Sequence, residues 1–116
     1  MYFGGFRDME DMVNQFEIKQ SELADATIIA AVYEGGSYDG SAMVVYRKDG
    51  KLYEVHGSHC SCNGLEDCWN PEETSYDALM FRIEKGDMVG NYGREFVDTL
   101  VRGLIDDIFD REVLKN

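Results

Sequence analysis

Two alternating segments joined by Asp49-Gly50 constrain the fold of this chain more than any other feature of its 116 residues. Apolar and polar residues alternate in Ser41–Lys48 and again in Lys51–His56, as they do in strands with one buried face. Asp and Gly tolerate the positive φ values of a two-residue type I′ turn. The sequence therefore predicts an antiparallel β-hairpin over these residues.

A third strand is predicted before this hairpin. The apolar run Ala26–Tyr33 is typical of a strand that is covered on both faces. The segment Gly35–Gly40 is rich in turn residues and connects this run to the hairpin. We therefore expect a three-stranded antiparallel sheet.

Three helices are predicted from apolar residues at helical spacing. The first begins at Asp8, which we expect to be its N-cap. The second follows one of two capping segments, Asn70–Glu73 or Thr74–Asp77. The third covers residues 94–114 and contains Gly103, which costs helix stability and therefore predicts a close crossing over another element.

These elements predict one compact domain over residues 1–116, which agrees with the usual domain size. The predicted class is α+β, with a three-stranded antiparallel sheet and three helices in the order α-β-β-β-α-α. Because an antiparallel sheet can leave one face in solvent, we expect the three helices to cover a single face.

The net charge of −12, from 11 basic and 23 acidic residues, limits the partners. A negative field repels phosphate backbones and anionic membranes, so we expect no direct binding to nucleic acid or membrane. No apolar run is long enough to span a bilayer, and we expect no signal peptide. We therefore expect a cytoplasmic protein whose three cysteines are reduced.

The segment 57–70 holds all three cysteines and one of the two histidines. Thiolate and imidazole are the ligands that zinc prefers, and four of them close a structural site. The spacing differs from the Cys-x2-Cys of a zinc knuckle, so a packed turn with free thiols and no cofactor remains the other interpretation. His56 could complete the set. The candidate metal ligands are His59, Cys60, Cys62 and Cys68.

The same segment gives little support for a catalytic site. A Cys–His nucleophile needs an orienting group and an oxyanion hole, and the sequence indicates neither. Neighbouring acids raise the pKa of a thiol and so oppose thiolate formation. We therefore predict no catalytic residues.

Acidic residues on the helices and beside the loop suggest a binding surface. Such residues can imitate a phosphate array and be steered to a basic surface of another protein. A solvated acidic coat is the other interpretation. Trp69 is the aromatic side chain that we expect at the centre of a contact. The candidate partner-binding residues are Glu66, Asp67, Trp69, Glu72, Glu73, Asp106, Asp107 and Asp110.

The segment Lys51–Glu66, followed by Trp69–Thr74, resembles a group of small phage and prophage proteins without an established activity. The shared motifs are Ser-His-Cys-x-Cys-x-Gly-Leu-Glu after a strand and Trp-x-Pro-Glu-Glu-Thr before a helix, within residues 41–85. The position of Cys68 is not a cysteine in that group, which weakens Cys68 as a zinc ligand. The resemblance implies a phage or mobile-element origin, and hence the cytoplasm of an infected or lysogenic bacterium.

Small acidic phage proteins often block host machinery, so the resemblance implies such a role. We expect an interaction protein without catalysis. It would bind the basic surface of a host nucleic-acid-handling complex and block that complex, as anti-CRISPR and anti-restriction proteins do. The alternative is a small zinc-binding regulatory protein that uses residues 56–68. Apolar helix residues beyond those needed for a core, Phe96, Phe109 and Leu114, are compatible with a homodimer.

Overall fold

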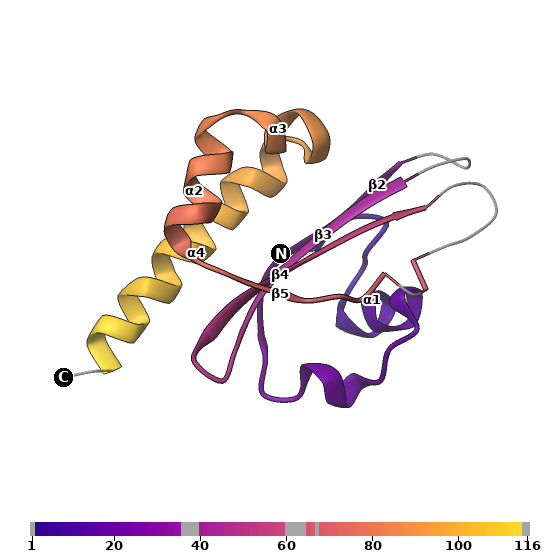
Figure 1. The fold of residues 1–116 in the computed structure, drawn as a ribbon, viewed down its shortest axis with the longest axis horizontal. Helices are drawn as coiled ribbons and strands as arrows, with labels where there is room; N and C mark the ends of the chain where they lie inside the picture. Colours follow the sequence, from indigo (N-terminus) through magenta and orange to yellow (C-terminus); the bar gives the residue numbers. More distant parts are fainter. Residues whose placement is uncertain (1, 36–39, 60–64, 67, 115–116) are drawn as a thin grey trace.

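The computed structural model describes residues 2–35, 40–59, 65–66 and 68–114, and only the backbone of residues 35, 59, 87 and 110–114 (Figure 1). Its strands are β1 (Tyr2–Gly4), β2 (Thr27–Gly35), β3 (Gly40–Lys48), β4 (Lys51–His59) and β5 (Glu72–Thr74). Its helices are α1 (Met9–Phe16), the short 3-10 helix η1 (Gln20–Leu23), α2 (Tyr76–Glu84), α3 (Asp87–Tyr92) and α4 (Arg94–Leu114).

The sheet has five strands in the order β1-β2-β3-β4-β5. β1 is parallel to β2, and the other neighbours are antiparallel. The prediction of a three-stranded antiparallel sheet is therefore wrong, although its three strands correspond to β2, β3 and β4. The two added edge strands have three residues each. So short a strand carries no readable alternation, and it forms because a neighbouring strand offers unpaired backbone groups.

The predicted hairpin is confirmed by the register of β3 and β4. Lys48 pairs with Lys51, which leaves Asp49 and Gly50 as a two-residue turn. Their φ values are 54° and 78°. Both are positive, as a type I′ turn requires.

Helices cover both faces of the sheet, with α1 on one side and α2, α3 and α4 on the other (Figure 1). The prediction that three helices share one face, in the order α-β-β-β-α-α, is therefore wrong. The fold is α+β, with four α-helices in the part of the chain that the structure describes. The physical reason lies in β2, whose residues 28–32 are all buried and need apolar partners on both sides.

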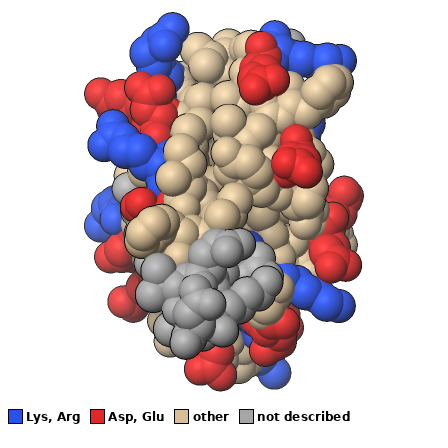
Figure 2. Space-filling model, turned by 90° about the vertical axis from the view of Figure 1, so that its left-hand side faces the viewer, with Lys and Arg blue, Asp and Glu red and all other residues tan. Residues whose placement is uncertain are grey.

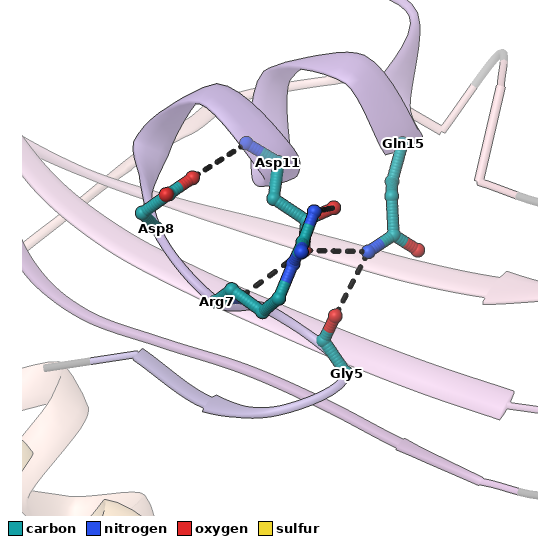
Figure 3. A network of polar contacts seen from close by, with 5 residues as sticks. All are labelled: Gly5, Arg7, Asp8, Asp11 and Gln15. Atoms are coloured by element: carbon teal, nitrogen blue, oxygen red, sulfur yellow. Dashed lines mark hydrogen bonds and ion pairs between the residues drawn. The ribbon is translucent and has the colours of Figure 1, made fainter.

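The N-cap of α1 also anchors the chain that leads from β1 (Figure 3). The carboxylate of Asp8 accepts a hydrogen bond from the backbone N–H of Asp11 at 2.8 Å, which confirms the predicted cap. The Asp11 carboxylate accepts from the backbone N–H of Arg7 and from the Gln15 amide, and that amide also donates to the carbonyl of Gly5. These bonds fix α1 beside the sheet edge.

The long helix α4 crosses β2 at Gly103, which confirms the predicted close crossing. A Cβ atom at Gly103 would lie 2.6 Å from Cγ2 of Ile29. A register shift between Ile28 and Ala30 marks a bulge in β2 at this point. Ile29 and Ala30 consequently both belong to the core beneath α4.

Candidate functional site

A groove lies between the end of α1 and the segment that leads into β5. Its volume is about 640 Å³. Aromatic, aliphatic and charged side chains share its walls, so it can hold a partner group that has both an apolar and a charged part. We call it the Trp69 groove. It is lined by Phe16, Glu17, Ile18, Lys19, Glu22, Trp69, Asn70 and Pro71.

The ring of Trp69 is held in place by aromatic side chains from distant parts of the chain. It packs edge-on against Phe16, with 5.0 Å between ring centroids. It stacks on Tyr46 at 5.8 Å and an interplanar angle of 11°, and Tyr46 stacks in turn on Tyr53. Burial, with smaller effects of Tyr53 and Glu22, raises the pKa of Tyr46 to about 12, so its hydroxyl stays protonated. The groove therefore has a preformed aromatic wall.

Two carboxylates and one ammonium group line this groove. Glu17, Lys19 and Glu22 are all exposed. A second lysine nearby, Lys48, donates a hydrogen bond to the backbone carbonyl of Glu22 at 2.8 Å and leaves the carboxylate available. An aromatic ring beside carboxylates suits a guanidinium group, which stacks on rings and pairs with carboxylates.

The described acids next to Trp69 point to different faces of the sheet. Asp67 lies outside the described residues, and Glu66 is half-buried near Tyr33, whose pKa is raised by burial and then by Cys68 and Glu66. On β5, Glu72 lies opposite Glu54 and Glu73 lies opposite Tyr53. Because adjacent residues of a strand point to opposite faces, only Glu73 lies on the α1 side with the Trp69 groove.

The predicted acids of α4 are not equivalent. Nε of Arg47 donates to both carboxylate oxygens of Asp107 at 2.7 Å, and both side chains are largely buried. Asp107 therefore neutralises Arg47 and joins α4 to β3. Asp106 is exposed, and the side chain of Asp110 lies outside the described part. The side of the molecule formed by α2 and α4 is largely uncharged in its middle (Figure 2). Among the predicted acids of α4 with described side chains, Asp106 is therefore the one that is exposed to a partner.

A buried charged cluster was missed by sequence reasoning. Glu54 of β4 is 5% exposed. It accepts hydrogen bonds from Nε2 of His56 at 2.5 Å and from Arg82 of α2. Burial alone would raise the pKa of Glu54, but the hydrogen bonds from His56, Arg82 and Thr74 and the charge of Arg82 lower it to about 2. The sequence contained one signal for this cluster. The alternation over Leu52–His56 places Glu54 and His56 on the same face of the strand.

The cluster links two elements of the fold. A carboxylate that orients a histidine is one part of a general-base system, which also needs a nucleophile within hydrogen-bond reach. His56 makes no hydrogen bond to a hydroxyl or thiol among the residues that the structure places. The ion pair instead joins β4 to α2 across the sheet surface.

Three of the four predicted zinc ligands have side chains that lie outside the described residues. Cys60 and Cys62 lie outside the described residues, and only the backbone of His59 is described. Cys68 is half-buried and donates from Sγ to the carbonyl oxygen of Ser58 at 3.4 Å. It packs on the α1 side, whereas His56 lies with Glu54 on the other face. The structure therefore separates Cys68 from His56.

Within residues 2–35, 40–59, 65–66 and 68–114, no group of three potential metal-binding side chains comes together. None of the helices in this part of the chain combines the length and the apolar character needed to cross a membrane. In comparisons with known proteins, no family model, no curated protein and no solved structure matches this chain.

Proposed function

We propose that this chain is a small acidic interaction protein of phage type, which binds and blocks a host nucleic-acid-handling protein in the bacterial cytoplasm and has no catalytic activity of its own. The Trp69 groove is the observation that supports this function best. It combines a fixed aromatic ring with two exposed carboxylates, Glu17 and Glu22. Such a groove is built to bind a group rather than to transform it.

An arginine side chain of the partner fits this groove. The planar guanidinium stacks on an indole ring, and its donors pair with carboxylates. Its aliphatic stem would lie against Ile18 and Pro71. Arginine and lysine are concentrated on the surfaces that proteins use to bind phosphate backbones. Occupation of such a surface would exclude the nucleic acid.

The charge of the α1 side supports the same partner. Residues 1–25 contain six acidic and two basic residues, a net charge of −4. Their field attracts a basic surface before contact and raises the association rate, an effect that salt screens. Glu73, which lies on the α1 side, adds to this field without lining the groove.

The proposal is tested by charge reversal in the groove. The variant Glu17→Lys/Glu22→Lys should lose capture of a nucleic-acid-binding protein from nuclease-treated bacterial lysate. Its control, Glu84→Lys/Glu95→Lys, has the same net charge but changes exposed residues of α2 and α4. We expect the control to retain capture. Equal loss in both variants, or no loss in either, would contradict a role for the groove.

A direct measurement uses Trp69, the only tryptophan of the chain. Titration with an arginine-rich peptide should change the emission of Trp69, and a lysine-rich peptide of equal length should have a weaker effect because an ammonium group does not stack. The lysine double variant should abolish the arginine response. A response that is the same for both peptides would indicate general charge attraction only.

A further inference from the structure

The outer side of α2 and α4 exposes three large apolar side chains. Phe81 of α2 is 58% exposed, Ile105 of α4 is 50% exposed and Phe109 of α4 is 67% exposed. Figure 2 shows this side of the molecule, where uncharged side chains fill much of the area outside the grey residues and most charged side chains lie toward its borders. Clustered exposed apolar groups with a polar border mark interaction sites.

Four exposed residues of α4 form a continuous seam. Asp98, Arg102, Ile105 and Phe109 are exposed and follow one another at intervals of four, three and four residues. This spacing keeps them on one side of the helix, as in the contact seam of paired helices. The opposite side of α4 is buried against the sheet through residues such as Leu100 and Leu104. The seam therefore faces away from the core.

Phe81 extends this apolar surface from the neighbouring helix. Tyr76 at the start of α2 and Ile108 of α4 line the same small pocket, so the two helices lie side by side at that point. They run in opposite directions (Figure 1). Because each residue rises about 1.5 Å along a helix, Phe81 lies near the level of Gly103. The ammonium group of Lys85 lies 4.6 Å above the Phe81 ring and marks one border.

We propose that a second copy of this chain binds this surface, with the two α4 helices packed antiparallel about a twofold axis near Gly103 and Leu104. This arrangement sets Arg102 of each copy opposite Ile105 of the other, with Asp106 one residue further along. Arg102 and Asp106 are exposed and have no ion pair among the described residues. The twofold axis would therefore form two identical ion pairs between Arg102 and Asp106, beside the two Ile105 side chains that flank the axis.

The Arg102 and Asp106 pair, which a twofold axis can match to itself, favours a second copy over another partner. A net charge of −12 makes two copies repel each other over most of their surface. Contact between them is least unfavourable where the surface is uncharged, as on this side (Figure 2). The seam also carries both a cation and an anion beside Ile105, so it is complementary to itself. Phe96, expected from the sequence to serve a dimer, is instead buried in the core at 1% exposure.

The test is sedimentation velocity over a concentration series of the full chain. We expect a reversible dimer, and we expect Phe109→Glu and Ile105→Glu to shift the equilibrium to monomer with an unchanged melting temperature. Asn14→Glu is the control, since it adds the same charge at an exposed site of α1. A monomeric wild type, or a dimer that tolerates both variants, would overturn the proposal, as would equal weakening by the control.

A charge exchange tests the antiparallel arrangement. Arg102→Asp and Asp106→Arg should each weaken the dimer about tenfold in dissociation constant. The double variant should restore the dimer, because both ion pairs form again with reversed polarity. Failure of this restoration would overturn the proposed geometry. The surface lies across the sheet from the Trp69 groove, so the proposal does not depend on the proposed function.

Discussion

At the scale of single residues, Glu54 shows how burial and pairing act against each other. Removal of a carboxylate from water is unfavourable, and three hydrogen-bond donors compensate for that cost. The net effect lowers the pKa of Glu54 from 4.5 to about 2, so the folded state favours the ionised form. The resulting stabilisation is present above about pH 4.5 and is lost as the pH falls from 4.5 through 2.

The variant Glu54→Gln should therefore be less stable at neutral pH by about 3 kcal/mol, the equivalent of the shift in pKa. This difference from the wild type should shrink as the pH falls toward 2, because the wild type then loses its own ion pairs. Urea unfolding at several pH values measures it. The exposed neighbour Glu73→Gln is the control and should show a constant small difference. A difference in unfolding free energy between Glu54→Gln and the wild type that stays the same at every pH would contradict the lowered pKa of Glu54.

Gly103 is a second residue at which neighbouring side chains decide the effect of a substitution on stability. An Ala at this position gains about 1 kcal/mol in helix propensity. Its Cβ would lie 2.6 Å from a methyl group of Ile29, which is branched at Cβ and cannot turn away. Overpacking of a core costs about 1–3 kcal/mol. We therefore expect Gly103→Ala to lower the free energy of unfolding by about 1 kcal/mol.

Thermal or chemical unfolding measures this effect, and Gly90→Ala in α3 is the matched control. A Cβ at Gly90 meets no atom within 4 Å, so only the propensity gain remains there. Stabilisation by both substitutions would show that α4 can move away from β2 at little cost.

At the scale of elements, sequence reasoning succeeded where the signal is local. The Asp49-Gly50 turn and the Asp8 cap depend on residues a few positions apart, and both were predicted correctly. β1 and β5 were missed because their pairing with β2 and β4 decides their conformation. The apolar run 26–33 already indicated cover on both faces, and this signal was incompatible with placing every helix on one side.

The candidate site was only partly predictable for the same reason. Trp69 was identified as a contact residue, but its supporting rings on Phe16 and Tyr46 come from other elements. Arg47 and Asp107 form an ion pair although they lie 60 positions apart in the sequence. No local sequence pattern predicts such a pair. Exposure of Phe109 was likewise set by where α4 meets the sheet, since helical spacing alone gave it the same status as the buried Phe96.

At the scale of the whole molecule, the sheet separates two surfaces that differ in charge and in apolar character. The α1 side presents the Trp69 groove within an acidic segment, and the α2–α4 side presents exposed apolar residues. A dimer through the second surface would leave both grooves accessible on its outer sides. Two linked grooves would bind a repetitive basic surface more tightly than either groove alone.

The two surfaces should respond to salt in opposite directions. Binding of an arginine-rich peptide in the Trp69 groove should weaken from 50 to 500 mM NaCl, because salt screens the attraction between opposite charges. Dimerisation should strengthen over the same range, because salt screens the repulsion between two chains of net charge −12, which outweighs the attraction within the two Arg102–Asp106 pairs, and leaves the apolar contact intact. Trp69 emission reports the first equilibrium and sedimentation velocity the second. A common direction of change would show that one kind of interaction governs both surfaces, and the assignment of separate roles to them would then be wrong.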